Sequence, residues 1–131
     1  MNFKLMLAAI ACAIPLMTTT VAWSGANDYT FEPVKAEIKK GDGITIAVRI
    51  IDKRSGNAVS DAVIFSPRVD MSPEGMETMT AVVTPTAGPE PGTYGFKTNL
   101  QMAGRWLLTV PAKVQGELQT VTGKVTFKAT D

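Results

Sequence analysis

The stretch Ile44-Thr45-Ile46-Ala47-Val48-Arg49-Ile50 alternates large apolar side chains with small or polar ones. A period of two residues places alternate side chains on opposite faces of a strand, so the pattern predicts a half-buried β-strand. Turn-forming residues bound it on both sides: Gly41-Asp42-Gly43 precedes it, and Lys53 to Asn57 follows it. The sequence therefore predicts a strand over residues 43–52.

The rest of the chain after residue 23 shows no convincing helical period. Short runs with strand character, separated by Gly, Pro, Asn and Asp, predict six further strands near 29–38, 60–70, 77–84, 93–99, 104–114 and 117–129. About seven short strands at this spacing predict an all-β fold, an immunoglobulin-like antiparallel β-sandwich. A small closed barrel is the alternative architecture.

Composition excludes several classes of function. The 131 residues allow one domain, and a net charge of +1 leaves no basic excess for nucleic acid. The chain has no His and one Cys, which removes Ser–His–Asp and Cys–His catalysis. No phosphate-binding loop or dinucleotide fingerprint is present. We expect a protein that is not an enzyme.

The N-terminus predicts export to the periplasm. Lys4 precedes an apolar run over residues 5–14, and small residues follow, which is typical of a signal peptide. We assign residues 1–22 to the signal peptide and 23–131 to the domain, with cleavage after Ala22 or, alternatively, Ala26. Cys12 is then lost with the leader, and the mature domain has no disulfide. The other interpretation is an uncleaved membrane anchor, because residues 5–23 carry no charge over 19 positions.

Two segments stand out, Pro89–Phe96 and Leu100–Val110, the second of which contains Met102-Ala103-Gly104-Arg105-Trp106. Both resemble the YtkA-like/FixH-like family of exported or membrane-tethered bacterial domains. Asp61-Ala62-Val63 and the loop Met71–Met79 fit the same pattern, and the resemblance covers most of residues 30–128.

The resemblance implies a small β-sandwich and two kinds of role. Some members of the family are similar to accessory proteins of copper and heavy-metal efflux systems, and others to assembly factors for a copper-containing oxidase. The oxidase-associated members keep a membrane helix, and this chain departs from them if its leader is cleaved. Either role implies a membrane efflux or oxidase-assembly complex as a partner.

Four methionines of the mature chain are the candidate metal ligands: Met71, Met76, Met79 and Met102. Thioether sulfur is a soft donor that suits Cu(I) or Ag(I) and needs no deprotonation. Met71, Met76 and Met79 share a loop with Pro73 and Gly75, which allow it to fold back. The sequence thus predicts a Cu(I)/Ag(I)-binding accessory protein. The alternative is a non-catalytic interaction or assembly domain that docks on a membrane complex.

Core packing is the competing interpretation of these methionines, because Met fills irregular gaps in cores. The alternation of apolar residues along the predicted strands places Met71, Met79 and Met102 in register with core-facing positions. It leaves Met76 out of register with them. Phase likewise assigns Trp106, Tyr94 and Phe96 to the core, although Trp106 beside Met102 also suits a ring that faces a bound cation.

The carboxylates beside the methionine loop are Asp70, Glu74 and Glu77. Their spacing matches no calcium-binding loop, and charges in such a position usually belong to a solvated loop. We expect them to be exposed to solvent.

Overall fold

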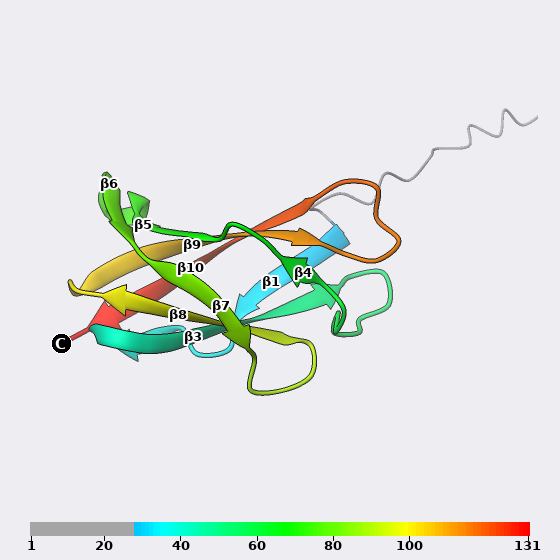
Figure 1. Ribbon diagram of the computed structural model, residues 1–131, viewed down its shortest axis with the longest axis horizontal. Coiled ribbons are helices and arrows are strands. Elements are labelled where there is room, and N and C mark those ends of the chain that lie inside the picture. Colours follow the sequence, from blue (N-terminus) through cyan, green and yellow to red (C-terminus); the bar gives the residue numbers. More distant parts are fainter. Residues whose placement is uncertain (1–27) are drawn as a thin grey trace, which may run out of the picture.

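The computed structural model describes residues 28–131 as two stacked β-sheets (Figure 1). One sheet has four strands, in the order β1 (Tyr29–Pro33), β3 (Gly41–Asp52), β8 (Thr93–Leu100) and β7 (Val83–Ala87). The other has six strands. Five run in the order β2 (Glu37–Lys39), β10 (Val121–Thr130), β9 (Gly104–Lys113), β5 (Arg68–Met71) and β6 (Met76–Ala81), while β4 (Val63–Ile64) pairs with β9. The immunoglobulin-like antiparallel β-sandwich is confirmed, with β2–β10 as a parallel exception.

The predicted strand over residues 43–52 lies in the middle of the four-stranded sheet. Its Ile46, Val48 and Ile50 are buried, and the residues between them are more exposed. β3 pairs antiparallel with β8 on one side and with β1 on the other. The apolar face of the strand therefore points into the sandwich, as the alternation predicts.

The core lies between the two sheets and joins side chains of both. Ile46, Val48 and Phe96 come from the four-stranded sheet, and they pack in one cluster with Trp106 and Leu108 of β9. Each sheet keeps two edge strands, so the closed-barrel alternative is wrong. Trp106 and Phe96 are buried as predicted, and Tyr94 is half-buried against the same cluster.

Three predicted strands are each divided in two, which gives ten strands in place of about seven. The predicted strand 29–38 becomes β1 and β2, and 77–84 becomes β6 and β7; in both cases the chain crosses from one sheet to the other. Val82 lies between β6 and β7 and is 73% exposed at this crossing. The predicted strand 60–70 becomes β4 and β5. It is broken at Ser66, whose φ is 46°, and at Pro67, which has no N–H to donate to a sheet.

The predicted signal peptide lies outside the described residues, and so does its cleavage site. Among residues 28–131, no helix has the length and apolar character needed to cross a bilayer.

Candidate functional site

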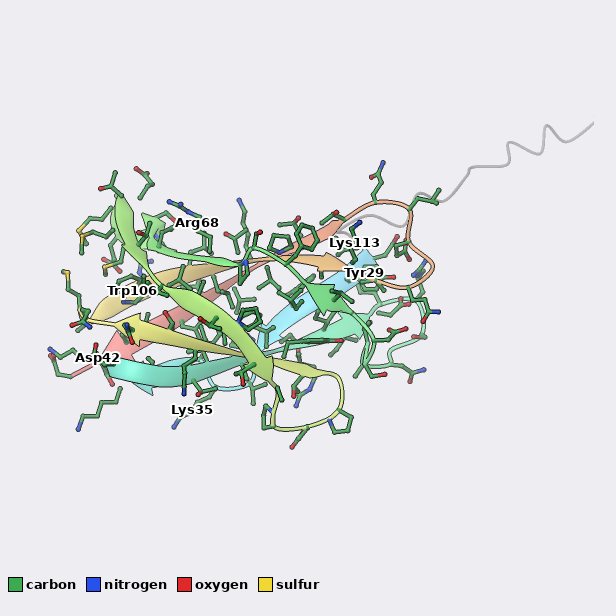
Figure 2. All side chains as sticks on the ribbon, in the orientation of Figure 1. Tyr29, Lys35, Asp42, Arg68, Trp106 and Lys113 are labelled. Atoms are coloured by element: carbon green, nitrogen blue, oxygen red, sulfur yellow. The ribbon has the colours of Figure 1, made fainter. Side chains whose placement is uncertain are left out.

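The predicted methionine loop forms a hairpin at one end of the sandwich. β5 ends at Met71, a 3-10 turn follows over Ser72–Glu74, and β6 begins at Met76. Gly75 closes the turn with φ of 74°, a left-handed conformation that glycine adopts without strain, and its N–H donates to the Ser72 carbonyl at 2.9 Å. Figure 2 shows sulfur atoms gathered at the end of the molecule that carries Trp106.

Met71 and Met76 lie opposite each other on the two strands of this hairpin. Met71 is 1% exposed, and its methyl group lies against Gly104, where an added Cβ would come within 2.9 Å of it. Met76 is half-buried and packs against the same core cluster. The hairpin and the β8–β9 turn are therefore in contact through Met71 and Gly104.

Met79 and Met102 contradict the assignment from strand phase. Phase places both in the core, yet they are 39% and 40% exposed. Met79 lies in an irregular part of β6, because Asp70 pairs with Thr80 while Met71 pairs with Met76, so the strand alternation is interrupted. Met102 lies in the turn between β8 and β9, beyond the alternation of either strand. Met71 is in the core as phase predicts, and Met76, which phase leaves outside, is half-buried.

Trp106 fixes the turn that carries Met102. Its indole is 2% exposed, and Nε1 donates to the Met102 carbonyl at 3.0 Å. A buried indole N–H needs such a partner. The backbone of the β8–β9 turn is thereby attached to the core, and the Met102 side chain extends from a held position.

Asp70 is not the solvated loop carboxylate that we expected. It is 6% exposed and accepts from the Ser72 N–H at 2.9 Å and from Arg68 Nε at 3.0 Å. Burial acts to raise the pKa of Asp70, but the hydrogen bonds from Ser72 and Arg68 outweigh it and hold the pKa below its ordinary value. Asp70 therefore stabilises the start of the 3-10 turn. Because this turn connects β5 and β6, Asp70 also stabilises the shape of the methionine hairpin.

Asp70→Asn is expected to lower the free energy of unfolding by about 1–3 kcal/mol at pH 7, because the amide is uncharged and keeps one of the two acceptor oxygens that bind Ser72 and Arg68. The pKa of Asp70 is lower in the folded chain than in the unfolded chain. Its contribution is therefore present above pH of about 4 and is lost as the pH falls through the folded pKa. Urea unfolding at pH 7 and at pH 3 measures this, with exposed Asp61→Asn as the control. Two results would contradict the role of Asp70. One is an equal loss of unfolding free energy in Asp70→Asn and Asp61→Asn, and the other is a difference between wild type and Asp70→Asn that is larger at pH 3 than at pH 7.

Glu74 joins the hairpin to β9. Its carboxylate accepts from Arg105 Nε at 2.7 Å, and Arg105 also donates to the Pro73 carbonyl at 2.9 Å. Hydrogen bonds from Arg105 hold the pKa of Glu74 below its ordinary value. Glu77 is exposed, as expected. Within residues 28–131, no three side chains of the His, Cys, Asp and Glu types are grouped in a way that would hold a metal ion.

A polar network at the opposite end of the domain was not predicted from the sequence. Glu117 Oε1 accepts from the Tyr29 hydroxyl at 2.5 Å and from Arg54 Nη2 at 2.9 Å, and Arg54 also pairs with Asp52. These residues line an open depression of about 510 Å³. Burial and the hydrogen bond to Glu117 raise the pKa of Tyr29 to about 12. The network holds β1 and two loops together. Tyr29, Arg54 and Glu117 lie at least 25 positions apart in the sequence, too far for any spacing rule to relate them.

Comparison with known proteins gives one family and several solved structures with partial similarity. A family model described as YtkA-like matches residues 24–111. The C-terminal domain of ZirS is 14% identical with a TM-score of 0.48, and the match covers 82% of this chain and 68% of that one. The filamin domain of Lin-41 is 20% identical with a TM-score of 0.43, over 79% and 92% of the two chains. The Yersinia pseudotuberculosis adhesin InvE is 14% identical with a TM-score of 0.45 over 80% of this chain, which spans 27% of that one. No curated protein sequence matches the chain.

Proposed function

The chain belongs to the YtkA-like family, and on this basis we propose that it is a non-catalytic accessory domain, exported to the periplasm, that binds one Cu(I) or Ag(I) ion through methionine sulfur. Its role is in metal handling or efflux, with the ion as cargo. The proposed ligands are Met76 with at least two of Met71, Met79 and Met102.

The placement of the four thioethers carries the proposal. Met79 and Met102 are 39% and 40% exposed at the end of the sandwich where Met71 is buried and Met76 is half-buried. A methionine that only fills a gap in the core would be covered, and these two are not. Two partly exposed methionines and two deeper ones, on the hairpin and on the turn that it contacts through Gly104, suit an ion that enters from solvent and is held against the core.

The donor type selects the ion. Thioether sulfur is neutral and soft, so it favours Cu(I) and Ag(I) over Zn²⁺, Ni²⁺ or Mg²⁺. Because a thioether has no proton to lose, affinity does not depend on the pH, unlike the affinity of thiolate or imidazole sites. The indole hydrogen bond to the Met102 carbonyl supports the site by limiting the motion of the β8–β9 turn.

A Cu(I) titration of the wild-type chain against a competing chromophoric chelator tests the proposal. We expect one ion per chain, equal affinity at pH 5 and pH 8, and no competition from Zn²⁺ in excess. Failure to compete with the chelator, or an affinity that falls as the pH falls, would contradict it.

The alternative is an interaction domain that docks on a membrane complex. Exposed apolar side chains support this alternative, since Val63 is 63% and Val82 is 73% exposed. In that case the exposed Met79 contacts a protein partner and the titration shows no binding of Cu(I).

A further inference from the structure

The outer face of the six-stranded sheet carries a regular array of lysine and threonine. Along β10 the residues facing the core are buried, and the alternate residues point outward and are exposed or half-buried. These outward residues are Thr122, Lys124, Thr126, Lys128 and Thr130. A rise of about 3.3 Å per residue places Lys124 and Lys128 about 13 Å apart on the same face of the strand.

Neighbouring strands add further cations to the same face. The register pairs Lys128 with Arg105, places Arg68 opposite Thr109, and places Lys39 beside Thr130. Lys113 lies at the far end of β9, opposite Val63. We call these six side chains the basic face: Lys39, Arg68, Arg105, Lys113, Lys124 and Lys128. Figure 2 shows Arg68 and Lys113 on one side of the molecule and Lys35 on the other.

Negative charge opposes only part of the basic face. Asp70 is buried under Arg68, and Glu74 of the neighbouring 3-10 turn pairs with Arg105 at 2.7 Å. Glu37 is exposed beside Lys128. Lys113, Lys124 and Lys128 make no ion pair within residues 28–131. Lys128 also lies directly across from Arg105, an arrangement of like charges that destabilises a sheet. Positive charge is concentrated here in a chain whose net charge is only +1.

The chemistry of the basic face favours a lipid surface over a protein or a nucleic acid. Protein interfaces are anchored by Tyr, Trp and large apolar side chains and are poor in Lys, whereas the outward residues of β10 are only Thr and Lys. Single-stranded nucleic acid needs aromatic side chains for stacking, and this strand presents none. Lysine is a mobile point charge with little geometric demand, and it suits a fluid surface of phosphate groups.

We propose that the basic face binds the surface of a membrane rich in anionic lipid. The six-stranded sheet of the sandwich then lies against the bilayer. The attraction is electrostatic and needs no metal ion. Each basic side chain near an anionic surface contributes roughly a fivefold factor in affinity. Removal of Lys113, Lys124 and Lys128 together is therefore expected to weaken binding on the order of 100-fold.

The test is flotation of the metal-free chain with vesicles of phosphatidylcholine containing 30% phosphatidylglycerol or none. We expect binding that requires phosphatidylglycerol and is lost at 1 M salt, where the screening length falls to about 3 Å. The triple variant Lys113→Gln, Lys124→Gln, Lys128→Gln should lose it. The control variant Lys35→Gln, Lys53→Gln, Lys97→Gln removes the same charge away from this face and should keep it. All forms carry the same N-terminus, so any contribution from the leader is common to them.

Equal binding by the two triple variants would overturn the proposal, since net charge alone would then explain the attraction. Binding that is independent of phosphatidylglycerol would overturn it as well. Retention of the wild type on immobilised polyglutamate without binding to vesicles would indicate an acidic protein partner instead. Circular dichroism of each variant establishes that the substitutions leave the sheets intact.

Discussion

Replacement of all four methionines by leucine is expected to abolish Cu(I) binding and leave the domain folded. Leucine has a similar volume, and swaps of this kind usually cost less than about 1.5 kcal/mol each. The cost falls mainly on Met71, which is 1% exposed, and less on Met79 and Met102, which are partly in solvent. A methylene group cannot donate to a metal, so affinity is lost although the packing remains.

Chelator competition on the wild type, Met76→Leu and the quadruple variant measures this loss. The variant Glu77→Gln is the matched control, because it removes a nearby exposed carboxylate and keeps all four sulfurs and the Glu74–Arg105 pair. We expect the control to stay within a few-fold of the wild type, while Met76→Leu weakens binding and the quadruple variant shows none. Equal affinity of the wild type and the quadruple variant would remove the metal site and leave the interaction domain.

Gly123→Ala is expected to lower the free energy of unfolding by about 3 kcal/mol. Gly123 is buried on the inner face of β10, and an added Cβ would lie 2.1 Å from Cγ of Phe31, over the ring. Phe31 belongs to β1, which pairs with β3, so the ring cannot move away without disturbing that pairing. Overpacking of this kind costs typically 1–3 kcal/mol, and a contact over the ring places it at the upper end.

A double-mutant cycle with Phe31→Ala isolates this contact. In the Phe31→Ala background the ring is absent, so the added Gly123→Ala is expected to cost less than about 1 kcal/mol. Urea unfolding of the four proteins gives the coupling energy. Additive losses would mean that Gly123 is needed for another reason.

The sequence predicts the strands better than their assignment to sheets. The alternation over residues 44–50 contains both the strand and its buried face, because both depend only on the period of two. No comparable sequence pattern indicates that the chain passes from one sheet to the other at Pro33–Glu37 and at Val82. Whether a strand continues in one sheet or moves to the other depends on which distant strands are free to pair, and local periodicity does not carry that information.

In the candidate site, too, some features could be predicted from the local sequence, and others depend on the tertiary fold. The hairpin and the burial of Met71 and Trp106 follow from local pattern and turn residues. The exposure of Met79 depends on an irregular pairing between β5 and β6, and that of Met102 on the length of the β8–β9 turn. The Tyr29–Arg54–Glu117 network joins residues 25, 63 and 88 positions apart, which only the tertiary fold brings together.

X-ray absorption at the copper edge of the chain loaded with one equivalent of Cu(I) tests metal binding by thioether most directly. The nearest shell should contain sulfur alone, since residues 28–131 include neither His nor Cys. The quadruple Leu variant, treated identically, should retain no copper after desalting. A nearest shell of nitrogen or oxygen in the wild type, or sulfur coordination that persists in the quadruple variant, would contradict a methionine site at the end of the sandwich.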